Sequence, residues 1–275
     1  MTFALGHKAQ AAGYRLTAFE AIGSTNAEAI ARANAGDAGG HWLVTDQQTS
    51  GRGRRGRAWQ TPRGNLAATN LAILAAPPAV AATLGFVAGL SLDEALRRLA
   101  PSLQVATGLD WAAADGNTDR LRLKWPNDVL LDGRKLAGIL LEAASLADGR
   151  IAVATGIGVN VVSAPTGLPY PAISIAELGT AITAQDLFEE LSDAWVVYAR
   201  IWDEGRGFSM IRKRWLDRAA GLGADVAITV GGEVLAGVFE TIDPEGHLVI
   251  RSSDGGRRSI SAGEVHFGTV ATARP

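Results

Sequence analysis

The sequence predicts an α+β protein made of two parts, a larger one and a small C-terminal β-barrel. In the larger part, strand-like and helix-like segments mix without a regular βαβ alternation, which favours a mixed or largely antiparallel sheet with helices. After Gly221-Leu222-Gly223 the pattern changes to short strand-like segments with turn signals about every 8–12 residues, which is typical of a small barrel. We therefore predict one domain at residues 1–221 and a second at residues 222–275.

The composition is that of a soluble globular protein, with 275 residues, 47% hydrophobic and 20% charged. A net charge of −2 provides no overall attraction to DNA or to an acidic membrane. The absence of cysteine excludes disulfides, thiolate metal sites and cysteine nucleophiles. It also fits a reducing compartment, and we predict a cytoplasmic protein.

Two segments bear on targeting and membranes. Residues Met1 to Gly13 contain no long apolar stretch, so a secretory signal is not expected. Residues Leu71 to Leu92 carry no charge, but Pro77-Pro78 interrupts them and alanine and glycine dominate. We therefore predict a strand at 66–75 and a core helix at about 79–100, with no membrane partner.

Capping and turn signals predict most other elements. Ser24 or Thr25 is a good N-cap for the helix that follows, and Gly36 suits its C′ position. Asp132-Gly133 predicts the turn of a hairpin. Further strands are expected at 41–45, 121–125, 129–131, 135–142, 151–162, 225–230, 234–241, 247–252, 257–261 and 264–268, helices at 184–204 and 207–220, and a loop at 110–119.

The most informative segment is Gly51 to Gly56, followed by Arg57 and Trp59. It places four arginines among three glycines, and no acidic residue occurs between Asp46 and Asp93. Glycines allow the backbone to approach phosphate closely, and guanidinium groups bind phosphate oxygens bidentately. The segment therefore predicts a loop that closes over a polyanionic small molecule, with the aromatic ring stacked on a base.

The loop allows two other interpretations. It matches G-x-G-x-x-G, but no clear helix follows it, and the acidic residue that a Rossmann site needs about 20 residues later is missing. A Walker A sequence is also missing, which excludes a P-loop NTPase. A solvated arginine-rich turn that binds RNA stays as an alternative.

Lys124-Trp125-Pro126-Asn127-Asp128 forms a second motif. Pro126 follows a strand and predicts a turn that places Asn127 and Asp128 at the end of that strand. Asp128 is a candidate contact for Mg²⁺ or a ribose hydroxyl, and a simple turn is the alternative.

Two further motifs carry candidate ligand contacts. Arg134 at the hairpin turn is expected to face solvent, whereas Lys135 begins an apolar strand and suits a ligand carboxylate or phosphate, with a structural role equally open. Gly156 and Gly158 inside a strand indicate either close approach of another group or a β-bulge. Asn160 would bond phosphate or satisfy backbone groups.

Ser24, Thr25, Asn26 and Gln48 complete the set of polar candidates. Small hydroxyls at a helix start either cap the helix or bind a polar head group. Together the motifs provide cations for phosphate, an aromatic ring for a base, neutral donors and a lysine. This combination suits the activation of a carboxylate by ATP, in which arginines and Mg²⁺ offset the repulsion between two anions.

In these motifs the chain resembles the biotin–protein ligases over nearly its whole length. The matching pieces, in order, are Ser24-Thr25-Asn26, Gln48-Thr49, GRGRRGRAW (51–59), KWPNDVLL (124–131), RKLAGILLE (134–142), GIGVN (156–160) and Gly263-Glu264-Val265. The resemblance implies a catalytic domain like those of class II synthetases, followed by an SH3-like barrel.

The resemblance also implies a two-step reaction with biotin, ATP and Mg²⁺, in which biotinyl-5′-AMP forms and biotin passes to a lysine of the biotin carboxyl carrier protein of acetyl-CoA carboxylase. Biotin contacts are implied for Ser24, Thr25, Asn26, Gln48, Gly51, Arg52, Lys135 and Gly138. Contacts with ATP or the adenylate are implied for Arg54, Arg55, Arg57, Trp59, Asn127, Asp128, Gly156, Gly158 and Asn160. Catalytic roles are implied for Lys135, Arg54 and Arg55.

Some family members carry an N-terminal winged helix, but only about 20 residues precede Ser24 here. We therefore predict a monofunctional ligase without a DNA partner. Family members include monomers and dimers, and no apolar stripe decides whether this chain forms a homodimer. The alternatives are a lipoate–protein ligase, which the arginine loop disfavours, and a non-catalytic module that binds nucleotide or RNA.

Overall fold

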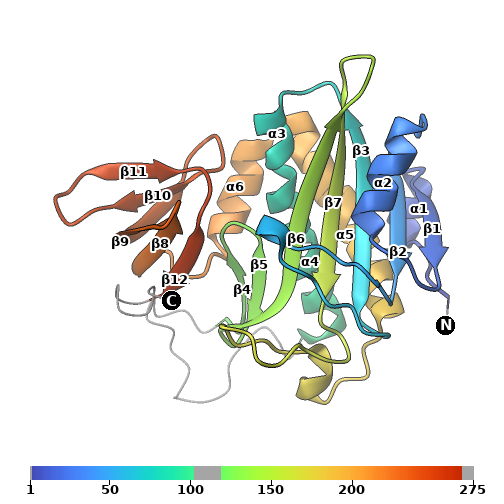
Figure 1. Cartoon of the computed structure of the whole chain (residues 1–275), viewed down its shortest axis with the longest axis horizontal. Helices are drawn as coiled ribbons and strands as arrows, with labels where there is room; N and C mark the ends of the chain where they lie inside the picture. Colours follow the sequence, from blue (N-terminus) through green and yellow to red (C-terminus); the bar gives the residue numbers. More distant parts are fainter. Residues whose placement is uncertain (1, 102–118, 268–275) are drawn as a thin grey trace.

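The computed structural model describes residues 2–101 and 119–267, and a seven-stranded sheet forms its centre (Figure 1). The strand order is β1-β2-β3-β7-β6-β5-β4. The strands are β1 (Arg15–Phe19), β2 (His41–Thr45), β3 (Leu66–Leu74), β4 (Leu121–Lys124), β5 (Asp128–Leu131), β6 (Arg134–Ser145) and β7 (Ile151–Val159). This confirms the predicted α+β class and every strand predicted in the larger part.

The sheet is mixed because one pair of strands is parallel. β1 pairs with β2 in parallel through α2 (Thr25–Asn34), whereas the other neighbours pair antiparallel. β1 and the short α1 (His7–Ala11) are elements that the sequence patterns do not predict. β1 lies at the edge of the sheet and is only partly buried, so its sequence lacks a strong apolar pattern.

Helices cover both faces of this sheet. On one face, Ala29 and Ala33 of α2 pack on Leu43 and Leu71. On the other face lie α4 (Leu84–Leu99) and α5 (Ala184–Trp202), with α6 (Phe208–Leu216) beside them (Figure 1). This second face holds the larger core.

The uncharged segment forms a core helix region, as predicted, but in two pieces. α3 (Pro78–Ala82) and α4 are separated by Thr83, whose hydroxyl accepts a hydrogen bond from Trp202 Nε1 at 2.7 Å. Pro78–Leu99 is long and apolar enough to cross a membrane, but 72% of its most apolar window is buried inside the protein. Burial of this kind is what a core helix of a globular protein shows.

The predicted hairpin around Asp132-Gly133 is confirmed. Both residues have positive φ, 50° and 70°, as a type I′ turn requires, and the flanking β5 and β6 pair antiparallel. In this register Asp128 pairs with Gly138 at the far end of β5 and Lys135 pairs with Leu130 beside the turn, and the Lys135 side chain reaches back to Asp128. The loop predicted at 110–119 lies outside the described residues except for Asp119.

The C-terminal part is a five-stranded antiparallel sheet in the order β11-β10-β9-β8-β12. Its strands are β8 (Asp225–Val230), β9 (Glu233–Ile242), β10 (Leu248–Arg251), β11 (Arg257–Ile260) and β12 (Glu264–Phe267), close to the predicted ranges. It contacts the larger part, where Trp125 Nε1 donates to Gly246 O at 3.1 Å. We propose a domain boundary at 221/222, although the two parts share one continuous hydrophobic core.

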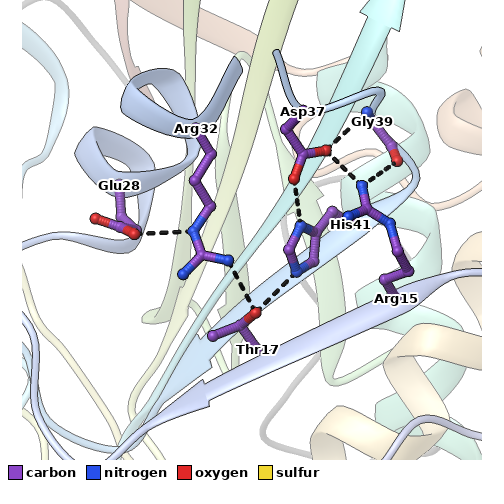
Figure 2. A network of polar contacts seen from close by, with 7 residues as sticks. All are labelled: Arg15, Thr17, Glu28, Arg32, Asp37, Gly39 and His41. Atoms are coloured by element: carbon purple, nitrogen blue, oxygen red, sulfur yellow. Dashed lines mark hydrogen bonds and ion pairs between the residues drawn. The ribbon is translucent and has the colours of Figure 1, made fainter. Parts of the chain in front are cut away.

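A polar network ties β1, α2 and β2 together (Figure 2). Asp37 accepts from Arg15 Nη2 at 2.5 Å, and its other oxygen lies 2.7 Å from Nδ1 of buried His41. His41 Nε2 lies 2.9 Å from Thr17 Oγ1, which also accepts from Arg32 Nη1 at 3.0 Å. The carboxylate of Asp37 therefore holds the turn between α2 and β2.

Asp37 makes the stability of this unit depend on pH. Burial alone would raise the pKa of Asp37, but hydrogen bonds from Arg15, His41 and the Gly39 N–H lower it to about 2. A lowered carboxyl pKa stabilises the fold at neutral pH, and this stability is lost as pH falls through the folded pKa.

We expect Asp37→Asn to lower the free energy of unfolding by about 1–2 kcal/mol at pH 7. The difference from the unsubstituted protein should shrink between about pH 4 and pH 2. Urea unfolding followed across pH measures both effects. Asp148→Asn, which removes an exposed pair with Arg150, is the control and should change little. An equal loss in both variants would contradict this account of Asp37.

Candidate active site

A cavity of about 400 Å³ lies between the end of the seven-stranded sheet and the C-terminal sheet. The glycine–arginine loop (residues 51–59) borders it together with the β4–β5 turn, β6, β7 and β12. Of the predicted site residues, all but Gly51 and Asn160 line this cavity. The structure thus brings together motifs that are separated by up to 241 residues, from Ser24 to Val265.

The predicted polar residues form one hydrogen-bonded group at the start of α2. Gln48 Oε1 accepts from the Thr25 N–H at 2.9 Å and lies 3.2 Å from Thr25 Oγ1. Thr69 Oγ1 lies 2.7 Å from both Thr25 Oγ1 and Asn26 Oδ1. Ser24 Oγ accepts from the Ala27 N–H, which confirms its role as the N-cap. Sequence reasoning missed Thr69, which lies on a buried strand with no motif around it.

Asn26 explains one of the two strand glycines. Its side chain is buried and donates to Leu140 O at 3.1 Å. A Cβ on Gly156 would lie 2.3 Å from Asn26 Oδ1. Gly156 therefore leaves room for a side chain of the protein, and the pairing of β7 with β3 and β6 is continuous here, so the alternative of a β-bulge is wrong.

Gly138 and Gly158 form a flat floor for Trp59. The two glycines are direct cross-strand partners on β6 and β7. A Cβ on Gly158 would lie 2.3 Å from Trp59 Nε1, and one on Gly138 would lie 3.2 Å from Trp59 Cζ3. The indole ring thus lies directly on the backbone of the sheet. Gly51 allows the two ends of this loop to lie close together, because a Cβ on Gly51 would lie 2.3 Å from Trp59 O.

Lys135 lies at the centre of the charged part of the cavity. Its Nζ is 2.7 Å from Asp128 Oδ1, and the side chain is largely buried. The ammonium also lies 5.7 Å from the Trp59 ring centroid and 5.3 Å from that of Tyr170. Arg134, in contrast, faces outward and pairs with Glu177 at 3.2 Å, as predicted. Tyr170 lies in a segment without a motif and was not predicted.

The arginines of the loop have different partners. Arg54 Nη1 donates to Asn127 Oδ1 at 3.1 Å, toward the β4–β5 turn. Burial lowers the pKa of Arg54, and the neighbouring Arg55 adds to this effect. Arg57 makes two hydrogen bonds to Glu264, at 3.2 and 3.0 Å, and Arg55 approaches Glu264 at 3.5 Å. Arg54 is therefore the arginine most enclosed in the cavity wall.

Arg52 and Asn160 complete the predicted set. Arg52 pairs with Glu142 on β6 at 3.3 Å. Asn160 lies behind the cavity wall, where its amide donates to Ile173 O at 3.2 Å. This arrangement matches the alternative in which Asn160 satisfies backbone groups, and its predicted contact with nucleotide stays a prediction.

Lys124, the first residue of the second motif, lines the cavity although the sequence predicts no role for it. It lies opposite Asp128 on the neighbouring strand, and its Nζ is 5.4 Å from the Phe267 ring centroid. Burial lowers the pKa of Lys124, and Lys135 lowers it further. Its position just before Trp125-Pro126-Asn127-Asp128 is the signal that could have identified it.

The cavity wall carries more cations than anions. Its lining includes Arg52, Arg54, Arg55, Arg57, Lys124 and Lys135, but only two carboxylates, Asp128 and Glu264. Within the described ranges, no group of three or more His, Cys, Asp or Glu side chains is placed to hold a metal ion. The site therefore suits an anionic ligand of the size of a nucleotide with a second small molecule.

An arginine-rich loop, a lysine beside a carboxylate and a polar pocket at a helix start fit an enzyme that binds an anionic substrate. Two family models match the chain: "Biotin/lipoate A/B protein ligase family" at residues 24–161 and "Biotin protein ligase C terminal domain" at residues 221–268. The chain belongs to the biotin/lipoate protein ligase family.

Curated relatives agree with this assignment, and a solved structure shares the fold. A biotin–[acetyl-CoA-carboxylase] ligase of Paracoccus denitrificans is 41% identical, over 89% of this chain and 97% of that relative. The relative of the same description from Mycobacterium tuberculosis is 33% identical, over 88% of this chain and 85% of its own length. The fold matches a biotin protein ligase from Aquifex aeolicus in complex with biotin and ATP, with a TM-score of 0.69 and 24% identity over 92% of this chain and 97% of that one.

The contact between Gly156 and Asn26 leads to a prediction about stability. We expect Gly156→Ala to lower the free energy of unfolding by about 1–3 kcal/mol, because the new methyl group would displace a buried amide. Chemical denaturation measures the change. Gly85→Ala in α4 is the control, since its Cβ would meet Leu141 at an ordinary 3.5 Å. A Gly156 variant as stable as the Gly85 variant would contradict the packing described here.

Proposed function

We propose that the protein joins biotin to ATP as biotinyl-5′-AMP and transfers the biotin to a lysine of the biotin carboxyl carrier protein of acetyl-CoA carboxylase. The observation that carries this proposal is the convergence of Lys135, Arg54 and the Thr25–Gln48 group on one cavity. The names of the relatives support it, since two that cover most of this chain are biotin–[acetyl-CoA-carboxylase] ligases.

In the first step, a carboxylate oxygen of biotin forms a bond to the α-phosphorus of ATP, and pyrophosphate leaves. Both reactants are anions, so the approach is opposed by electrostatic repulsion. The ammonium of Lys135 and the guanidinium of Arg54 offset this repulsion in a largely buried setting, where charge interactions are stronger than in water. In the second step, the amine of the carrier lysine attacks the biotinyl carbonyl, an amide forms, and AMP leaves.

The two ends of the cavity suit the two ends of biotin. Thr25 and Gln48 provide hydroxyl and amide groups for the ureido ring. Trp59 and the glycine floor provide an apolar surface for the tail, which ends near Lys135. The stacking of Trp59 on adenine stays a prediction, because the ring covers Gly138 and Gly158 here.

We propose that Mg²⁺ arrives with ATP. Asp128 is the carboxylate beside Lys135, and Mg²⁺ in nucleotide sites often uses one or two carboxylates together with phosphate oxygens. The donor set therefore fits a metal held mainly by the triphosphate. When bound, the metal would neutralise phosphate charge.

We propose a cytoplasmic site of action, which the lack of cysteine supports. That the protein has no DNA partner stays a prediction, and whether it forms a homodimer stays open. A non-catalytic role in RNA binding is disfavoured, because Arg55 and Arg57 are occupied by Glu264 and the chain belongs to a ligase family.

Lipoate is the competing substrate, since the matching family includes lipoate ligases. Native mass spectrometry after incubation with MgATP and equal amounts of biotin and lipoate tests the choice. We expect retained biotinyl-AMP. Retained lipoyl-AMP would support the adenylation reaction but show that biotin is the wrong substrate. If neither adduct forms and no pyrophosphate is released, the proposed function is wrong.

Lys135→Ala should reduce the rate of adenylate formation by about 100-fold or more, because the ammonium faces the developing phosphate charge. Pyrophosphate release measures this rate. Arg134→Ala, the neighbouring residue that faces outward, is the matched control and should keep nearly full activity. Similar rates for the two variants would remove Lys135 from the mechanism.

A further inference from the structure

The motif Gly263-Glu264-Val265 at the start of β12 has no role in the chemistry described above. β12 is an edge strand of the C-terminal sheet, and Glu264 pairs with Thr229 of β8. Its side chain nevertheless lines the cavity. Glu264 reaches the glycine–arginine loop although Arg57 and Glu264 are 207 residues apart in the chain.

Three arginines of the loop end on two adjacent residues of this motif. Both terminal nitrogens of Arg57 bond the carboxylate of Glu264, at 3.2 and 3.0 Å. Arg55 Nη1 lies 3.5 Å from the same carboxylate, and Arg54 Nη1 lies 3.5 Å from Gly263 O. The hydrogen bonds from Arg57 lower the pKa of Glu264, so the carboxylate is ionised at neutral pH.

The sheet fixes the position of this carboxylate. A Cβ on Gly263 would lie 2.6 Å from Ile228 Cγ2, so the chain before Glu264 packs closely against β8. The loop, in contrast, contains Gly51, Gly53 and Gly56, and glycines leave a loop many conformations. The contact therefore joins the glycine-rich loop to the start of β12, which the sheet holds in place.

The exposure of the pair indicates what the contact stabilises. The side chains of Arg57 and Glu264 are 55% and 31% exposed, and ion pairs this open contribute little to the stability of a whole fold. The free energy that stabilises one conformation of a surface loop is much smaller than that of the whole fold. The same small contribution therefore changes the population of loop conformations measurably.

We propose that Glu264 is a positioning residue that holds the glycine–arginine loop closed against the C-terminal sheet. By neutralising Arg55 and Arg57, it lets Arg54 lie beside them and reach Asn127 at the cavity wall. The effect on ATP rests on the proposed function, whereas the effect on the loop does not.

Hydrogen exchange of the ligand-free protein tests the loop directly. In Glu264→Gln, amides at 51–59 should exchange about fivefold faster, with the melting temperature nearly unchanged. Glu240→Gln is the matched control, because Glu240 also pairs with arginines on the C-terminal sheet but lies outside the cavity lining. Equal exchange at 51–59 in the two variants overturns the proposal.

Kinetics tests the consequence for the nucleotide. Glu264→Gln should raise the KM for MgATP about fivefold and leave the KM for biotin unchanged. Because Arg57 makes two hydrogen bonds to Glu264 whereas Arg55 lies 3.5 Å away, Glu264→Gln should raise the KM for MgATP less in the Arg57→Gln background than in the unsubstituted protein. An unchanged KM for MgATP, or fully additive effects, overturns the role in nucleotide binding. If the unsubstituted protein forms no adenylate, the proposed function fails, and hydrogen exchange alone decides about the loop.

Discussion

Four guanidinium groups within six residues are the constraint on which the site depends. Arginines this close repel one another unless nearby acceptors offset their charge. The acceptors come from three elements: Glu142 on β6, Asn127 in the β4–β5 turn and Glu264 on β12. The loop is therefore held between the two sheets. The C-terminal sheet, whose role cannot be read from its own sequence, becomes a wall of the cavity because one of these acceptors belongs to it.

The opposite wall depends on the absence of side chains. Gly138 and Gly158 face each other across β6 and β7, and Trp59 lies on them, while Gly156 leaves room for Asn26. A regular strand pairing with glycines at these points keeps the floor both flat and rigid. The loop can carry many glycines and charges because its aromatic end is seated on such a floor.

The sequence predicted the elements and motifs whose signals are local. The hairpin at Asp132-Gly133, the cap at Ser24 and the strands of both sheets follow from turn residues and periodicity. The edge strand β1, with half-exposed side chains, has no such signal. Site residues such as Thr69 and Tyr170 could not be predicted, because they have no motif of their own and depend on partners far away in the chain. The sequence of the glycine–arginine loop likewise shows that four arginines are present, but it does not show which residues each of them contacts.

Charge balance inside the cavity links the site to its ligand. Asp128 is shared between Lys135, which it contacts, and Lys124 on the adjacent strand. One carboxylate beside two ammonium groups leaves positive charge unbalanced. Burial lowers the pKa of Lys124, and the positive charge of Lys135 lowers it further. An anion entering the cavity relieves this imbalance, and a polyanion does so more fully than a monoanion. A neutral ligand leaves this positive charge unbalanced, and a single carboxylate offsets it only in part.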